Sequence, residues 1–167
     1  MDGSKLYSGD DNGRIKSWNL LNNSETELFK AKSWVWRISI HPTNPDLLLA
    51  GYESGEIYLI EISTKKCLKQ FYKHSNQITD FCWSRDSSHF VSCSLDKSFI
   101  LWNIKKTKPV QVWKTGNVIR GVYFSEDFKT LFAVCRTKLV SVESPIEELI
   151  NSPSTELLHT FRSKCIF

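Results

Sequence analysis

The sequence lacks the short motifs that identify nucleotide-binding proteins and zinc-dependent enzymes. It contains no phosphate-binding loop, no G-x-G-x-x-G and no H-E-x-x-H, and its four histidines are scattered among different turns and strands. Its five cysteines form no C-x-x-C pair and no zinc-ligand spacing, which is typical of free thiols in a reducing compartment. We therefore expect a protein that is not an enzyme and that has neither a metal site nor a cofactor.

Long hydrophobic runs are also absent. No apolar stretch approaches the ~20 residues that a membrane-spanning helix needs, and the start, M-D-G-S-K, lacks the apolar core of a signal peptide. We therefore expect no membrane span and an intracellular protein, either cytoplasmic or nuclear. The net charge of +4 is mild for 167 residues, so it permits an acidic partner without requiring nucleic acid.

The chain does contain a repeated unit, which is clearest between His74 and Asn103. Polar turns rich in Ser and Asp divide this stretch into three short apolar runs, Ile78–Trp83, Phe90–Cys93 and Phe99–Trp102. Short β-branched and aromatic runs at regular spacing indicate antiparallel strands joined by tight turns.

The unit recurs along nearly the whole chain. The residue that ends the third strand of each unit falls at steps of 42, 42 and 40 residues, at Trp18, Ile60, Trp102 and Val142. The turn before that strand recurs as well, as G-D-D-N-G, G-Y-E-S-G and C-S-L-D-K in the first three units. A period of about 40–45 residues is typical of the blades of a β-propeller.

These residues resemble the WD repeat of β-propellers. The resemblance rests on His74 at the front of the unit, Asp96 in its second turn and Trp102-Asn103 at its end, because the prototype opens near Gly-His and ends in Trp-Asp. The turn S-E-D-F-K-T-L of the fourth unit is similar to the family's S-P-D-G-K-x-L. The resemblance implies an all-β fold in a single domain, residues 1–167: a WD-repeat β-propeller segment of about four four-stranded antiparallel blades. The blades are expected at approximately 1–30, 34–71, 74–114 and 118–161.

The array that these blades predict is incomplete or open. The chain starts inside a blade whose innermost strand is absent, so further blades or self-association would be needed to close the propeller. In the alternative, a four-bladed ring, Lys164–Phe167 supplies that strand. Otherwise we expect Leu157–Phe161 as the outer strand of the fourth blade and Lys164–Phe167 as the start of a following strand. A helical insertion is predicted at approximately 144–152, where S-P-I-E forms a capping-box start.

The first strand of three blades departs from strict alternation in the same way. Its apolar positions follow the spacing V-x-x-V-x-F each time, at Val35, Ile38 and Ile40, at Ile78, Phe81 and Trp83, and at Ile119, Val122 and Phe124. An extra residue that recurs at one place predicts a β-bulge, which re-aims the side chains at that point.

The bulges should direct side chains towards one rim of the ring, and the turn before each third strand should add its tip. The candidate partner-binding rim therefore comprises Trp34, Trp36, Glu53, Gln77, Thr79, Leu95, Arg120 and Arg136, with Asp11 and Val118 beside them. Trp and Arg are enriched among the residues that dominate binding energy at interfaces. In the alternative, one or both indoles fill the space between neighbouring blades.

The resemblance also implies a buried hydrogen-bond chain of His74, Ser92, Asp96 and Trp102 in the third blade. In the family this set locks a blade: the Asp accepts from the His, the Ser bridges, and the indole N–H finds a partner. The alternative, a Ser-His-Asp nucleophile, requires a cleft and a geometry that composition does not supply. The other blades lack the full set, so we expect hydrophobic stacking to hold them together.

The resemblance implies a non-enzymatic scaffold that mediates protein–protein interactions within a multi-subunit complex. The alternative is a propeller segment that binds nucleic acid or an anionic surface through lysines on its outer strands, namely Lys65, Lys66, Lys69, Lys73, Lys105, Lys106, Lys108 and Lys114. These lysines also have a simpler explanation, because charged side chains protect exposed strand edges from aggregation.

Overall fold

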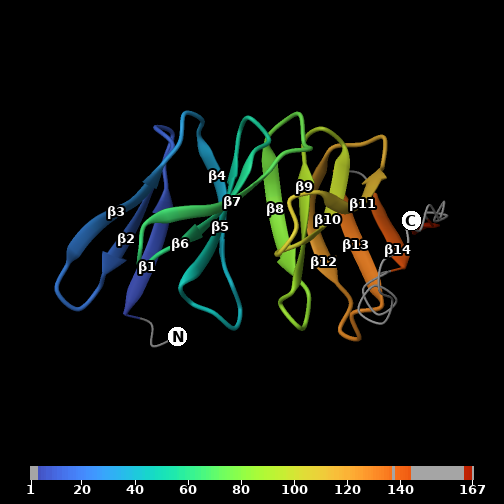
Figure 1. Ribbon diagram of the computed structural model, residues 1–167. Helices are drawn as coiled ribbons and strands as arrows, with labels where there is room; N and C mark the ends of the chain where they lie inside the picture. Colours follow the sequence, from blue (N-terminus) through green and yellow to red (C-terminus); the bar gives the residue numbers. More distant parts are fainter. Residues whose placement is uncertain (1–3, 137, 144–163, 167) are drawn as a thin grey trace.

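The computed structural model describes residues 4–136, 138–143 and 164–166, and it places strands but no helix among them. The strands form four antiparallel sheets, which stand side by side in chain order (Figure 1). Within the described residues the first and fourth sheets do not meet, so the array is open. The predicted all-β class and the partial propeller are confirmed.

We number the sheets one to four and call each a blade. The first contains β1 (Lys5–Gly9), β2 (Arg14–Asn19) and β3 (Ser24–Lys30). The second contains β4 (Val35–Ile40), β5 (Leu47–Tyr52), β6 (Ile57–Glu61) and β7 (Lys66–Phe71). The third contains β8 (Ile78–Trp83), β9 (His89–Ser94), β10 (Ser98–Asn103) and β11 (Pro109–Lys114). The fourth contains β12 (Ile119–Phe124), β13 (Thr130–Cys135), β14 (Leu139–Glu143) and β15 (Lys164–Ile166).

Each blade is a meander in which consecutive strands pair. The first strands of blades two, three and four lie next to one another, since β8 contacts both β4 and β12. These three strands therefore form the inner edge of the array. The first blade has three strands among the described residues, and β1, its edge strand, packs against β4.

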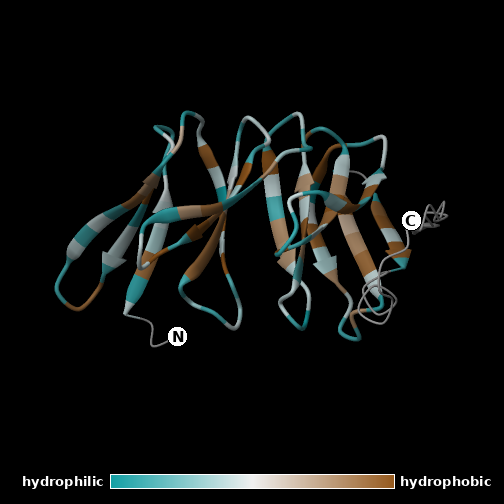
Figure 2. Cartoon of the chain, viewed as in Figure 1, coloured by the Kyte–Doolittle hydropathy of each residue, from teal (hydrophilic) through white to brown (hydrophobic). Residues whose placement is uncertain are grey.

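The core is divided among the spaces between neighbouring blades. Three apolar clusters fill these spaces, and each takes side chains from the two blades that face each other. On β10, for example, Ile100 and Trp102 pack towards the second blade, whereas Phe99 and Leu101 pack towards the fourth. A strand buried on both faces needs a continuous apolar run, which explains the F-I-L-W sequence. In Figure 2 most of the hydrophobic colour lies on the strands of blades two to four, and most of the turns are hydrophilic.

The predicted β-bulges are confirmed. The pairing register shifts between Val35 and Arg37 on β4, between Ile78 and Asp80 on β8, and between Ile119 and Gly121 on β12. The shift leaves one unpaired residue at the same place on each inner strand, which is Trp36, Thr79 and Arg120 in turn.

The outer strand of the fourth blade differs from the prediction. Lys164–Ile166 pairs with β14, with Ile166 opposite Leu139, so it belongs to the fourth blade and neither begins a further strand nor completes the first blade. The four-bladed ring closed by this segment is therefore wrong. The extended segment was expected, but three residues have no periodicity that could show which strand they pair with. The predicted strand Leu157–Phe161 and the predicted helix at 144–152 lie outside the described residues.

No helix with the length and apolar character needed to span a membrane is found in the described part of the chain.

Two glycines, Gly51 on β5 and Gly9 on β1, allow neighbouring blades to approach each other closely. A Cβ added to Gly51 at the end of β5 would lie 2.5 Å from Cγ2 of Ile78, on the first strand of the next blade. Gly9 on β1 faces Val35 of β4 in the same way, at 2.3 Å from its Cγ1. The repeated glycine of this turn therefore allows the inner strand of the next blade to pack closely.

We expect Gly51→Ala to lower the free energy of unfolding by about 1–3 kcal/mol, because the added methyl group overpacks the interface with β8. Urea unfolding of the full chain measures this loss. Ser54→Ala, an exposed change in the following turn, is the control and should leave the midpoint unchanged. An unchanged midpoint for Gly51→Ala would show that β8 can move away at little cost.

Candidate functional site

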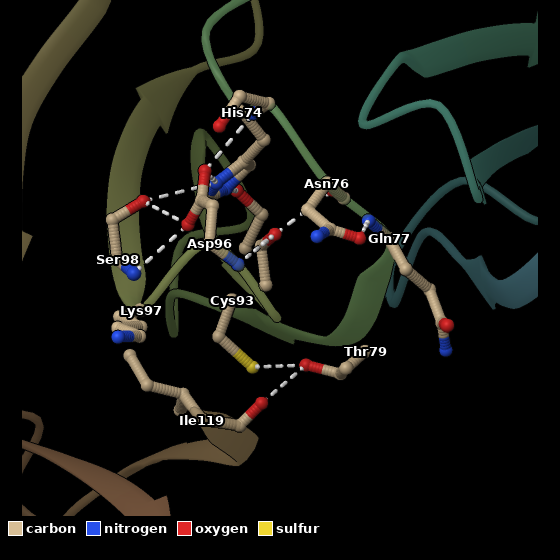
Figure 3. Close-up of polar contacts among 12 residues, drawn as sticks. His74, Asn76, Gln77, Thr79, Cys93, Asp96, Lys97, Ser98 and Ile119 are labelled. Carbon is tan, nitrogen blue, oxygen red and sulfur yellow. Dashed lines mark hydrogen bonds and ion pairs between the residues drawn. The ribbon is translucent and has the colours of Figure 1, made fainter. Parts of the chain in front are cut away.

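A chain of hydrogen bonds joins Trp102, Ser92, His74 and Asp96 inside the third blade. Figure 3 shows the end of this hydrogen-bond chain, where His74 meets Asp96. The indole Nε1–H of Trp102 on β10 donates to Oγ of Ser92 on β9 at 2.8 Å. The Ser92 hydroxyl lies 2.8 Å from Nε2 of His74, and Nδ1 of His74 lies 2.9 Å from Oδ2 of Asp96. With Asp96 ionised, Nδ1–H donates to its carboxylate and Nε2 accepts from Ser92. The structure thus brings together all four residues that the sequence suggested.

Asp96 is the acceptor at which the hydrogen-bond chain ends. Its carboxylate also accepts from the backbone N–H of Ser75 at 3.1 Å, from the N–H of Ser98 at 2.9 Å and from the Ser98 hydroxyl at 2.6 Å. Burial alone raises the pKa of Asp96, but the hydrogen bonds from His74, Ser98 and Ser75 outweigh it and hold the pKa well below its usual range. Ser98 is a member of the network that the sequence analysis missed.

The geometry of this hydrogen-bond chain suits a structural brace better than a catalytic site. Ser92 and Trp102 are fully buried, and the Ser92 hydroxyl is already bonded to both Trp102 and His74. A nucleophile needs a free approach for its substrate, and Ser92 has none. The bonds instead connect the segment before β8, the strands β9 and β10, and the turn between them.

The first blade retains only part of this arrangement. Trp18 Nε1–H donates to Ser8 Oγ at 2.8 Å, which repeats the bond of Trp102 to Ser92. Asn12 is exposed, and its side-chain amide donates to the carboxylate of Asp11. In the second blade Ile60, fully buried in the cluster against the first blade, occupies the Trp position. Stacking therefore carries more of the stability in these two blades.

The residues of the candidate rim lie at one end of the blades. Backbone bonds tie each turn tip to the start of the inner strand: Glu53 N–H donates to Trp34 O at 2.9 Å, and Leu95 N–H donates to Gln77 O at 3.0 Å. Arg136 follows Cys135, which is paired with Ile119 just before Arg120. Trp34 and Trp36 are each 49% exposed. Glu53, Arg120 and Arg136 are exposed, whereas Gln77, Thr79 and Leu95 are partly buried.

Two polar contacts connect the inner strands just below this rim. Thr79 Oγ1–H donates to the carbonyl of Ile119 at 2.8 Å, which joins the third blade to the fourth. Arg37 Nη2 lies 2.8 Å from Oδ1 of the buried Asp80, a close ion pair rather than an aligned hydrogen bond. The other oxygen of Asp80 accepts weakly from Val122 N–H at 3.4 Å. Sequence reasoning missed Asp80, although a charged residue directly after a bulge was a usable signal.

We expect Asp96→Ala to lower the free energy of unfolding by about 1–3 kcal/mol, because His74 Nδ1 and two backbone N–H groups lose their acceptor. Asn12→Ala is the matched control from the first blade. It should cost less than about 0.5 kcal/mol, as is usual for exposed positions. Urea unfolding of both variants makes the comparison. Equal losses of unfolding free energy in the two variants would show that the hydrogen-bond chain does not brace the third blade.

The brace should also depend on pH. The pKa of Asp96 is lowered in the folded protein, so its contribution to stability is present above the unfolded value of about 3.9 and is lost as pH falls towards the folded value. The stability difference between the wild type and Asp96→Asn should therefore be largest near pH 7 and shrink below about pH 5. Unfolding midpoints between pH 7 and pH 3 measure it. A difference that stays constant would contradict an ionised Asp96.

Comparison with known proteins finds the same repeat. Residues 65–103, which run from just before β7 to the end of β10, match the family model described as "WD domain, G-beta repeat". The GATOR2 complex protein WDR24 of Danio rerio is 25% identical over 150 residues, which are 85% of this chain and 19% of that protein.

Two further relatives match shorter stretches. The small ribosomal subunit protein RACK1 of Schizosaccharomyces pombe is 32% identical over 78 residues, covering 44% of this chain and 25% of its own length. Protein ROOT INITIATION DEFECTIVE 3 of Arabidopsis thaliana is 40% identical over 79 residues, which are 47% of this chain and 18% of that protein. The chain thus spans a quarter or less of each of these relatives. The matched repeat, these relatives, the four antiparallel blades and the hydrogen-bond chain of the third blade support a WD-repeat family for this chain.

Proposed function

We propose that this chain is a non-enzymatic scaffold segment whose rim holds a protein or peptide partner. The observation that carries the proposal is the half-exposure of Trp34 and Trp36 on a rigid inner strand and its entry. Exposed indoles offer a large apolar surface and lose little conformational entropy on binding. Arg120 and Arg136 add the second residue type that is enriched at interface hot spots.

The alternative role for the two indoles, filling space between blades, has less support. Val35 and Ile38 of the same strand already pack into the cluster between the first and second blades, and neither indole belongs to an apolar cluster. The side chains that alternate with the core residues are therefore available to a partner.

The names of two relatives support a place in an assembly. One is a protein of the GATOR2 complex, and another is a protein of the small ribosomal subunit. We propose by analogy that this chain acts within an intracellular multi-subunit complex, in the cytoplasm or the nucleus. Further blades, or association with a second copy, would close the open array and cover the edge of β1.

The double substitution Trp34→Ala with Arg120→Ala should abolish partner binding and leave folding intact. Hot-spot truncations weaken binding by upwards of ~2 kcal/mol, and both side chains are exposed. Affinity purification of the tagged full chain, with quantitative mass spectrometry and a melting curve, tests both parts. The matched control is Leu21→Ala, an exposed apolar truncation in the β2–β3 turn, away from the rim.

Two results would contradict this placement of the binding surface. If the double variant recovers its partners at the wild-type level, the rim is not the docking surface. If its melting curve collapses while that of Leu21→Ala does not, the two side chains serve the fold.

A second candidate surface lies on the outer strands. Lys69 Nζ donates to the carbonyl of Lys105, so the outer corners of blades two and three touch and their lysines gather there. None of the eight outer-strand lysines named in the sequence analysis forms an ion pair with a described carboxylate. Binding of a fluorescent oligonucleotide that weakens steeply with salt would favour this surface and phosphate contacts. No binding, or weak dependence on salt, would leave the rim as the single candidate.

A further inference from the structure

The rim is divided by charge. Its part on blades three and four carries three exposed cations, Lys97, Arg120 and Arg136, and none of them is paired with a described carboxylate. Its part on blades one and two carries the two indoles together with the exposed carboxylates of Asp11 and Glu53. The two halves therefore present different chemistry to a partner.

Backbone contacts hold the three cations in one region. The turn that contains Lys97 reaches the start of the fourth blade, where Thr115 N–H donates to Lys97 O at 3.0 Å. Thr115 lies four residues before Ile119, and Ile119 precedes Arg120. Figure 3 shows Ile119 held to the third blade by the hydrogen bond from Thr79. The pairing of Ile119 with Cys135 places Arg136 in the same corner.

The nearby carboxylates do not neutralise this corner. Asp96, next to Lys97, is committed to His74, Ser75 and Ser98. Asp80, next to the bulge of β8, is buried and paired with Arg37. The positive charge of the corner is therefore left for a ligand, and the mutual repulsion of the cations makes an incoming carboxylate more favourable.

We propose that the rim binds an acidic, extended segment of a partner protein, with carboxylates over Lys97, Arg120 and Arg136 and an apolar side chain against Trp34 and Trp36. The planar guanidinium group forms paired hydrogen bonds with carboxylates, which gives direction as well as affinity. Glu53 and Asp11 repel the acidic end from the indole side, so the segment has one orientation. This inference rests on the proposed function, and it names the chemistry of the partner.

Selection from a random peptide library displayed on phage, with the full chain as the target, tests this chemistry. Selected peptides should be rich in Asp and Glu beside one aromatic or aliphatic residue. The variant Arg120→Gln with Arg136→Gln, which removes charge from exposed positions, should lose the acidic enrichment while keeping the wild-type melting curve. Arg120→Lys with Arg136→Lys keeps the charge and should retain part of the enrichment.

A selected peptide then provides a direct measurement. Its affinity for the wild-type chain should fall at least about tenfold when its Asp and Glu are replaced by Asn and Gln, because charge-assisted hydrogen bonds are lost. Trp34→Ala should weaken binding of the acidic peptide and of its Asn and Gln derivative by the same factor, since the indole contacts the apolar residue that the two peptides share. The Asn and Gln peptide should be insensitive to Arg120→Gln.

The outcomes separate this inference from the proposed function. Neutral or basic peptides whose binding still depends on Trp34 would overturn the acidic partner and leave the rim as a docking surface. An acidic enrichment that survives Arg120→Gln with Arg136→Gln would also overturn it, because the carboxylates would then lie elsewhere. The absence of any selected peptide would contradict both proposals.

Discussion

Burial of both faces of the strands β5 and β9 is the constraint on which the rest of the structure depends. Each lies second in its blade, with a neighbouring blade on either side, and β9 is buried at every position. The equivalent strand of the first blade, β1, lies at the open edge, and its Leu6 is 55% exposed. The same position in the repeat is thus core or surface according to whether a neighbour covers it, so stability is a property of pairs of blades rather than of single blades.

This constraint explains where polar groups are tolerated. Ser92 lies on a strand with no exposed position, so its hydroxyl must be bonded within the protein, and a buried group without a partner costs free energy. The hydrogen-bond chain that runs from Trp102 to Asp96 meets that requirement. It ends at Asp96, in the turn between β9 and β10. The brace therefore fixes the turn that carries Leu95 and Lys97, and it connects the packing of the third blade to the shape of the rim.

The sequence predicted the features that repeat, and the family resemblance supplied the hydrogen-bond chain of the third blade, whereas two pairings that occur once were not predicted. The 42-residue step and the V-x-x-V-x-F spacing recur in several blades, and they gave the strands, the blades and the bulges at Trp36, Thr79 and Arg120. The segment Lys164–Phe167 was predicted to begin a strand, but the three residues of β15 have no period that could show that the strand pairs with β14. The link of Arg37 to Asp80 joins different blades, and a pattern within one blade cannot show which charges will meet across an interface.

The three bulges separate the residues that pack in the core from the residue that the sheet leaves unpaired. The apolar residues on either side of each bulge occupy the core, and they keep one spacing because the neighbouring blade leaves no freedom. The residue at the bulge is not paired in the sheet, so the strand pairing does not fix its identity, and here it is Trp36, Thr79 and Arg120 in successive blades. The rim therefore presents an aromatic side chain, a hydroxyl and a cation at equivalent positions of successive blades. The repeat pattern does not specify this order. The frame is therefore common to the blades, whereas the order of side chains along the rim is particular to this chain, and under the proposed function a partner would have to match that order.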